Sequence, residues 1–251
     1  MFRMNSRRSS VAAIAVFGLI AASCSSTTSS APTGAELVHK ASIAAATAGS
    51  VNYTLKATAT PTKTNPSPAI ESLVAAVSAP TSTQSLRFSD NTNNLDVSLI
   101  NGTIYVRGDN VTLNRAFGFP VAASSKYAGT WISIPPSDPT FAQIAGTLTL
   151  DSQTTPFFPV GQHVIIGKTR TLKGRRVIPL TGPSPANSSI KSGTLRLYID
   201  EKTHLPVAAG LIDVLTNGAK GTEVVDFISW GRPVNAVAPS GAVPISTAIK
   251  G

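Results

Sequence analysis

The 251-residue chain is long enough for one large domain or two small ones with a substantial buried core. Its single cysteine excludes an internal disulfide, so packing alone must stabilise the fold. The formal net charge of +9 comes from a chain with only 13% charged residues, and the densest basic stretch has no interleaved aromatic residues. This argues against nucleic-acid binding and favours attraction to anionic lipid head groups or an acidic envelope polymer. That basic stretch comprises Lys168, Arg170, Lys173, Arg175 and Arg176.

The N-terminus has the order of a bacterial lipoprotein signal. Three arginines precede an apolar run from Val11 to Ala22, which is shorter than the roughly 20 apolar residues that span a bilayer. The small residues Ala21-Ala22-Ser23 and the following Cys24 resemble the lipobox, in which the cysteine is lipidated and the chain is cut just before it. The alternative is an ordinary secretory signal with an incidental cysteine. We expect residues 1–23 to be removed and Cys24 to carry the lipid, because a secreted protein rarely keeps a lone thiol.

The next segments predict a tether and a helix. Residues 24–34 are small and polar after the cysteine, which is typical of a flexible linker. Ala35 to Ala48 is alanine-rich, with Glu36 in its first turn and Gly49 after its end, so it predicts a helix. We see no later linker and therefore expect one domain over residues 35–251.

Strand patterns begin immediately after this helix. Val51 to Ala59 alternates strictly between apolar and polar residues, which predicts a half-buried strand. A proline-rich loop follows, and the apolar positions of Ala69 to Ser78 suggest a short helix. Leu86 and Phe88 indicate another strand. Leu95 to Ile100 and Thr103 to Arg107 flank Asn101-Gly102, the preferred type I′ turn pair, and predict a hairpin.

The remainder of the chain is also rich in strands. Asp138 to Gly146 suggests a helical turn capped by Asp138 with Pro139 at its first position, and the tail from Gly231 is expected to lie across the surface. Strands that follow each other directly indicate a large antiparallel sheet with a few short helices on one side, an α+β fold. The further predicted strands are Trp131 to Ile134, Val164 to Ile166, Arg175 to Leu180, Thr194 to Ile199, Pro206 to Leu215 and Glu223 to Trp230.

Motifs for chemistry are missing from the sequence. His39, His163 and His204 have no metal-ligand spacing. Asp90-Asn91-Thr92-Asn93 starts like a calcium loop, but Asn101 stands where the closing acid belongs. There is no nucleophile elbow, phosphate loop or dinucleotide fingerprint. We therefore predict no enzyme activity, no metal and no cofactor, although a hydrolase with an unrecognised carboxylate pair stays open.

Two late segments resemble a known family. Leu195-Arg196-Leu197-Tyr198-Ile199-Asp200, followed by Thr203-His204-Leu205-Pro206-Val207, is similar to a hairpin of the LolA-like superfamily. Asp226 to Val234 is similar to its closing strand. The lipobox, tether and first helix also fit the actinobacterial lipid-carrier lipoproteins of the LppX and LprG type. The resemblance implies a half-barrel sheet with helices on its concave side and a cavity for the acyl chains of a lipid or glycolipid.

These observations predict an exported protein, anchored by a lipid to the outer face of the cytoplasmic membrane, that binds or carries a lipid without catalysis. The alternative is an envelope interaction or regulatory protein with the same fold and no lipid transport. On residues alone, helices that fill the apolar face are about as plausible as a cavity. The candidate cavity lining is Val51, Tyr53, Leu55, Leu86, Phe88, Val97, Leu99, Leu195, Leu197 and Ile199.

Overall fold

The computed structural model describes residues 31–60, 70–78, 81–87, 94–161, 163–185, 190–216 and 218–250. A single compact unit begins at Pro32. Cys24, the predicted signal and most of the predicted tether lie outside the described residues. In the described part, no helix is long and apolar enough to cross a membrane.

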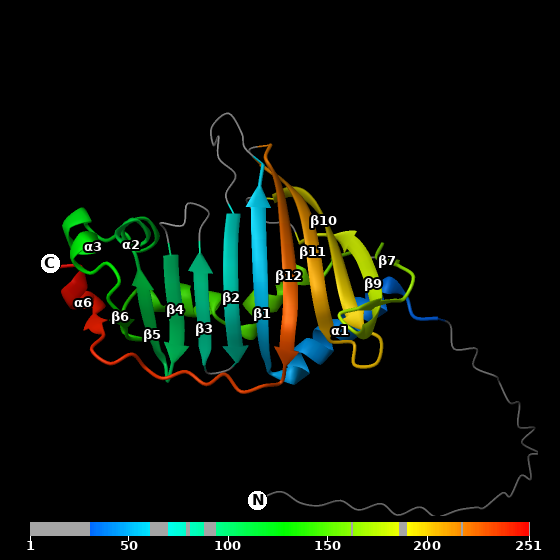
Figure 1. Cartoon of the computed structure of the whole chain (residues 1–251), viewed down its shortest axis with the longest axis horizontal. Helices are drawn as coiled ribbons and strands as arrows, with labels where there is room; N and C mark the ends of the chain where they lie inside the picture. Colours follow the sequence, from blue (N-terminus) through cyan, green and yellow to red (C-terminus); the bar gives the residue numbers. More distant parts are fainter. Residues whose placement is uncertain are drawn as a thin grey trace, which may run out of the picture. The chain divides into compact units, whose positions relative to one another are not determined.

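The described strands form one large, open and curved sheet, so the predicted α+β half-barrel is confirmed (Figure 1). The strand order is β13-β6-β5-β4-β3-β2-β1-β12-β11-β10-β9-β7, and β8 also pairs with β9. Neighbouring strands are antiparallel except for β13 and β6. The strands are β1 (Ser50–Ala59), β2 (Ile70–Ser78), β3 (Ser82–Arg87), β4 (Asn94–Ile100), β5 (Thr103–Gly108), β6 (Ile132–Ile134), β7 (Ile165–Ile166), β8 (Arg170–Leu172), β9 (Arg175–Pro183), β10 (Ile190–Asp200), β11 (Pro206–Leu215), β12 (Lys220–Trp230) and β13 (Val243–Pro244).

Helices cover one face of this sheet, here called the inner face (Figure 1). The first helix forms as predicted: Thr33 and Glu36 make a reciprocal capping box, and Gly49 ends the helix with φ 72°. The helices are α1 (Gly34–Ala48), α2 (Asn110–Phe117), α3 (Val121–Lys126), α4 (Phe141–Thr147), α5 (Leu150–Thr154), the 3₁₀ helix η1 (Thr155–Phe157) and α6 (Ile245–Ala248).

Local signals identify the β4–β5 hairpin correctly. Asn101 and Gly102 have φ values of 50° and 77°, the left-handed conformation that a type I′ turn requires. The predicted turn near Asp138 also forms, but α4 begins later than predicted. The Asp138 carboxylate accepts hydrogen bonds from the backbone N–H and hydroxyl of Thr140, at 2.9 and 2.6 Å, one turn before the helix.

The helix predicted from Ala69 to Ser78 is wrong, because this segment forms strand β2. It lies between β1 and β3 and pairs with both. Its apolar positions fit a helix as well as a strand, and its alanines favour a helix locally. Hydrogen bonds from two neighbouring strands override that local preference. The predicted strand at Leu86 begins earlier, at Ser82, and Phe88 lies outside the described residues.

The C-terminal tail does more than cross the surface. Beyond Trp230 the chain runs along one end of the sheet to the opposite edge, where Val243 pairs with Ile132 (Figure 1). Ile245 and Ala248 of α6 are then buried against the sheet. The tail therefore lies on the surface as predicted over residues 231–242, but α6 departs from the prediction because its side chains fill part of the core.

Candidate functional site

The inner face carries two hydrophobic clusters at opposite ends of the sheet. In the first cluster, α1 and η1 pack on β9 to β12 and on β1 and β2. In the second, α2, α3 and α6 pack on β4 to β6. The largest fully buried side chains divide between them: Tyr53, Leu180, Leu195, Leu197, Ile199, Val51 and Val77 in the first, and Phe119, Ile104, Leu113, Ile132 and Ile134 in the second.

A row of four leucines joins the two clusters across the middle of the inner face. Leu55 pairs with Leu73, Leu73 with Leu86, and Leu86 with Leu95, so each lies on the strand next to the previous one. Three inter-strand spacings separate the first leucine from the last by about 14 Å. All four are only partly buried. This leucine row therefore connects the two clusters, and each leucine keeps part of its side chain exposed.

Strand β3 places two polar side chains beside the leucine row. Ser82 and Gln84 share the inner face with Leu86, because residues two apart point to the same side of a strand. Ser82 is 0% exposed, and among the described residues neither its hydroxyl nor the Gln84 amide nitrogen has a hydrogen-bond partner. A buried polar group without a partner costs roughly 1–3 kcal/mol. Both atoms are closed to solvent, so a ligand would reach them only if the segments that cover them moved.

Tyr53 holds helix α5 over the inner face, one row of side chains away from the leucine row. The Tyr53 hydroxyl donates a hydrogen bond to the Gln153 side-chain oxygen, and the Gln153 amide donates to the backbone carbonyl of Thr147. Burial raises the pKa of Tyr53 well above its usual range, so the hydroxyl stays protonated as a donor. Tyr53 thereby links the central strand β1 to the α4–α5 segment.

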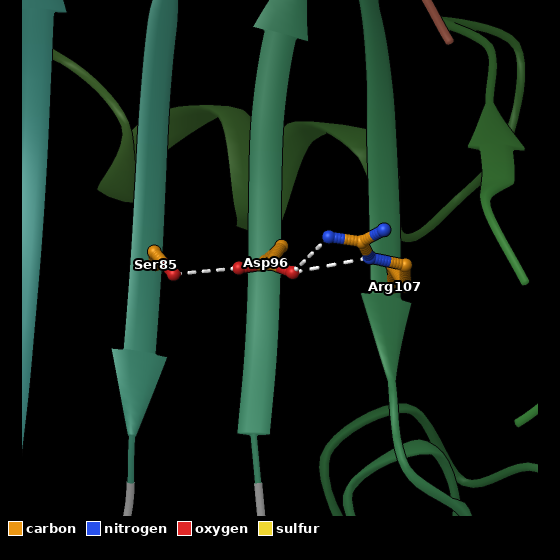
Figure 2. Close-up of polar contacts among 3 residues, drawn as sticks. All are labelled: Ser85, Asp96 and Arg107. Atoms are coloured by element: carbon orange, nitrogen blue, oxygen red, sulfur yellow. Dashed lines mark hydrogen bonds and ion pairs between the residues drawn. The ribbon is translucent and has the colours of Figure 1, made fainter. Parts of the chain in front are cut away.

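The outer face directly behind the leucine row is polar and tightly paired. The Asp96 carboxylate accepts a hydrogen bond of 2.6 Å from Ser85 and bonds of 3.1 and 2.8 Å from Arg107 (Figure 2). Arg107 also lies over the Trp131 ring, with its guanidinium carbon 4.7 Å from the ring centroid. These contacts hold β3, β4 and β5 together from the outer face, while their inner face packs against the helices.

The structure divides the predicted cavity lining into two groups. Val51, Tyr53, Leu195, Leu197 and Ile199 are at most 1% exposed and belong to the first cluster, and Val97 is buried in the second. These six act as core residues. Leu55, Leu86 and Leu99 are partly buried, so part of each side chain is exposed. Phe88 lies outside the described residues.

Sequence reasoning missed Leu73 and Leu95 as partners in the leucine row, and also a buried acid. The helix predicted from Ala69 to Ser78 includes Leu73, so the sequence does not reveal its place in the sheet. Asp213 on β11 is 3% exposed, and its oxygen accepts a hydrogen bond of 3.1 Å from Ser184. Burial raises its pKa, although this hydrogen bond opposes the shift. Gly193 leaves the space for this carboxylate, since a Cβ there would lie 1.7 Å from the Asp213 oxygen.

Three grooves lined by described residues lie away from the leucine row. One of about 650 Å³ is on the outer face between Ile165 and Arg196, and a second of about 310 Å³ adjoins it over Gly210. A third of about 330 Å³ lies between α1 and the segment after η1. In the part of the chain that the structure describes, no group of three acidic, histidine or cysteine side chains could hold a metal ion.

Comparison with known proteins tests the fold. The sequence matches no family model and no curated protein. Among solved structures, LprF from Mycobacterium bovis is similar with a TM-score of 0.51 and 14% identity, over 83% of this chain and 97% of that chain. A chain of the Pseudomonas aeruginosa MucA/MucB complex is more distant, with a TM-score of 0.34 and 13% identity over 83% of this chain and 59% of that chain.

A LolA-superfamily protein from Nitrosomonas europaea has a TM-score of 0.29 and 11% identity, over 82% of this chain and 96% of that chain. These last two likenesses are too distant to carry an argument. The likeness to LprF shows the fold alone, and the half-barrel fold expected from the sequence is confirmed.

Proposed function

We propose that this domain binds the acyl part of a lipid or glycolipid on the leucine row and acts as a non-enzymatic lipid-binding or lipid-carrying lipoprotein. In this proposal Cys24 bears the anchor, and the protein works on the outer face of the cytoplasmic membrane. The partly buried leucine row on the helix-covered face is the observation that carries the proposal, because large apolar side chains that stay partly exposed beneath short helices favour an apolar ligand.

The energetics of such binding need no polar motif. Burial stabilises a hydrocarbon chain by about 0.8 kcal/mol per methylene, so ten buried methylenes supply about 8 kcal/mol before the costs of ordering the chain. A row of leucines is therefore sufficient to hold one acyl chain. The lack of recognised catalytic motifs in the sequence is consistent with this role.

Ser82 and Gln84 supply the polar half of the proposal. If the covering segments move when a lipid enters, an ester or a sugar hydroxyl of the ligand would accept or donate hydrogen bonds at these two buried groups, which have no partner among the described residues. Removing the cost of an unpaired group adds to affinity and orients the lipid. We expect Gln84→Leu to lower discrimination between a glycolipid and a simple fatty acid, because the leucine keeps apolar contact and loses the amide.

Lipid uptake by residues 25–251, produced without the anchor, tests the proposal. These residues contain the whole compact unit and both hydrophobic clusters. Organic extraction and mass spectrometry should find co-purified lipid, and delipidated protein should bind a fluorescent acyl lipid. Leu86→Gln should weaken that binding at least tenfold. Ile228→Gln is the matched control, since Ile228 is exposed on the outer face of β12.

Three outcomes would count against the proposed lipid binding. Protein that carries no lipid after purification and takes up none after delipidation would exclude the proposal. Equal losses in the Leu86 and Ile228 variants would place the probe elsewhere on the protein. Stable co-purification with an envelope protein, without lipid uptake, would instead favour the alternative of an interaction or regulatory protein.

A further inference from the structure

The basic stretch of the sequence folds onto the outer face of the sheet. Arg170 lies over the ring of Tyr198, with its guanidinium carbon 4.7 Å from the ring centroid. Lys173 reaches further across, to an ion pair of 2.6 Å with Asp226 on β12. Both partners are on the outer face, because their neighbours in sequence belong to the buried first cluster. The β8–β9 hairpin is thus held against this face at two points.

The charges of this stretch are neutralised unevenly. Lys173 pairs with Asp226, and Arg176 pairs with Glu201 at 2.7 Å. Lys168 and Arg170 instead line the outer groove of about 650 Å³ together with Arg196. Its other described lining residues are Ile165, Gly167, Thr169, Pro179 and Thr181, so no carboxylate is among them. Three cations therefore face one groove without a compensating acid in its lining.

Threonine hydroxyls and arginine guanidinium groups line this groove. Arg196 donates a hydrogen bond of 3.3 Å to the Thr181 hydroxyl, and Thr169 adds a second hydroxyl to the lining. Neither this bond nor the stacking of Arg170 on Tyr198 cancels a charge. The guanidinium groups are therefore oriented, and they keep donors for an anion with several oxygens, such as a phosphate.

Exposed apolar side chains flank the cations. Ile165, in the lining itself, is 68% exposed. The adjoining groove shares Arg196 and is bordered by Ile212 and Val224, which are 62% and 55% exposed. Cations interspersed with exposed aliphatic side chains match the interface of a bilayer, where phosphates lie above acyl chains.

The start of the compact unit packs against Val164, the residue that precedes Ile165 of this groove in sequence. Gly34, at the first position of α1, abuts Val164 so closely that a Cβ would lie 2.1 Å from the Val164 carbonyl oxygen. Ile165 and the groove follow directly in sequence. Only nine residues separate Cys24 from Gly34 in the sequence. A lipid on Cys24 would therefore keep this edge of the sheet nearest to the membrane.

We propose that the outer groove formed by Lys168, Arg170 and Arg196 binds the phosphate of anionic phospholipid head groups, with Ile165 at the level of the acyl chains. This contact rests on the proposed anchoring at Cys24 for its geometry, and it does not require a lipid on the inner face. It gives the domain a defined orientation on the membrane, with the outer face of β7 to β10 toward the head groups.

Co-sedimentation of residues 25–251 with vesicles tests this contact separately from lipid uptake. We expect binding to vesicles of phosphatidylcholine with 30% phosphatidylglycerol, weaker binding to phosphatidylcholine alone, and a loss of binding as salt rises. The triple variant Lys168→Gln, Arg170→Gln, Arg196→Gln should bind on the order of 100-fold more weakly, about fivefold per charge. It should still take up acyl lipid on the inner face.

A control triple variant removes three positive charges from a different part of the surface. Arg115, Lys126 and Lys250 are exposed near the second cluster, at the opposite end of the sheet from β7. Their triple change to glutamine should lower vesicle binding less than fivefold. Equal losses in the two triple variants would mean that net charge alone drives binding and would overturn the site. Retained lipid uptake with no vesicle binding would overturn this inference and leave the proposed function standing.

Two further measurements identify the source of the phosphate and the orientation. Inorganic phosphate should not displace the protein from vesicles beyond the effect of sodium chloride at equal ionic strength. Specific displacement would identify a free-phosphate site and overturn the membrane contact. Ile165→Trp should show blue-shifted emission with anionic vesicles, above the signal of the two native tryptophans. Val121→Trp, at an exposed position of α3, should not; the reverse pattern would contradict the orientation.

Discussion

The leucine row and the buried core make opposite predictions for the same substitution. Leu197 is 0% exposed in the first cluster, so Leu197→Ala removes three buried carbons and leaves a cavity. We expect a loss of about 2–5 kcal/mol in the free energy of unfolding. Leu86 is only partly buried, so Leu86→Ala should cost about 1 kcal/mol, roughly half of the transfer free energy and little cavity cost.

Ligand affinity should follow the reverse order. If an acyl chain lies on Leu86, Leu86→Ala removes contacts worth about 1 kcal/mol and weakens binding about fivefold. Leu197→Ala should leave binding unchanged wherever the variant is folded. Urea unfolding followed by tryptophan fluorescence gives the stabilities, and titration with a fluorescent acyl lipid gives the affinities. Equal destabilisation by both substitutions, with unchanged binding in both, would show that the row is closed core and refute the reasoning.

Three further predictions concern stability. Asp213→Asn should raise the melting temperature at pH 7; because burial raises the Asp213 pKa, the native state loses stability as pH rises above the ordinary value of 3.8, so the gain should vanish below that pH. A gain that is equal at pH 3 and pH 7 in thermal melts would contradict this assignment. Gly193→Ala should cost about 1–3 kcal/mol in urea unfolding, because its Cβ would overlap both Asp213 and Ser184. Thr33→Ala should cost about 1 kcal/mol by the same measurement, since it removes the hydroxyl that accepts from the Glu36 backbone N–H.

Local chemistry accounts for the parts of the fold that the sequence predicts well. The Asn101-Gly102 turn, the Gly49 stop and the alternation from Val51 to Ala59 each depend on a few adjacent residues. Strand β2 is different, because its alanines and leucine suit a helix until β1 and β3 provide hydrogen-bond partners. The error arose where long-range pairing outweighs local preference.

The candidate site was only half predictable for the same reason. Leu55 and Leu86 could be placed on an apolar face by alternation, but their alignment with Leu73 and Leu95 depends on register between four strands. Alternation also cannot tell a covered position such as Leu197 from an open one, because the covering helices come from distant segments. The role of the basic stretch likewise required the fold, which separates paired cations from those in the groove.

The central seam of the sheet has a consequence for how the chain reaches its native state. Strand β1 pairs with β12, so Val51 lies opposite Trp230 although most of the chain separates them. Pairings between such distant segments form slowly, because closing the long intervening loop costs conformational entropy before any stabilising contact forms. The two meanders on either side can assemble from neighbouring segments, but they join only after the final long strand has arrived. If the protein is exported unfolded, as the proposed location implies, this sheet is completed only after the whole chain has crossed the membrane.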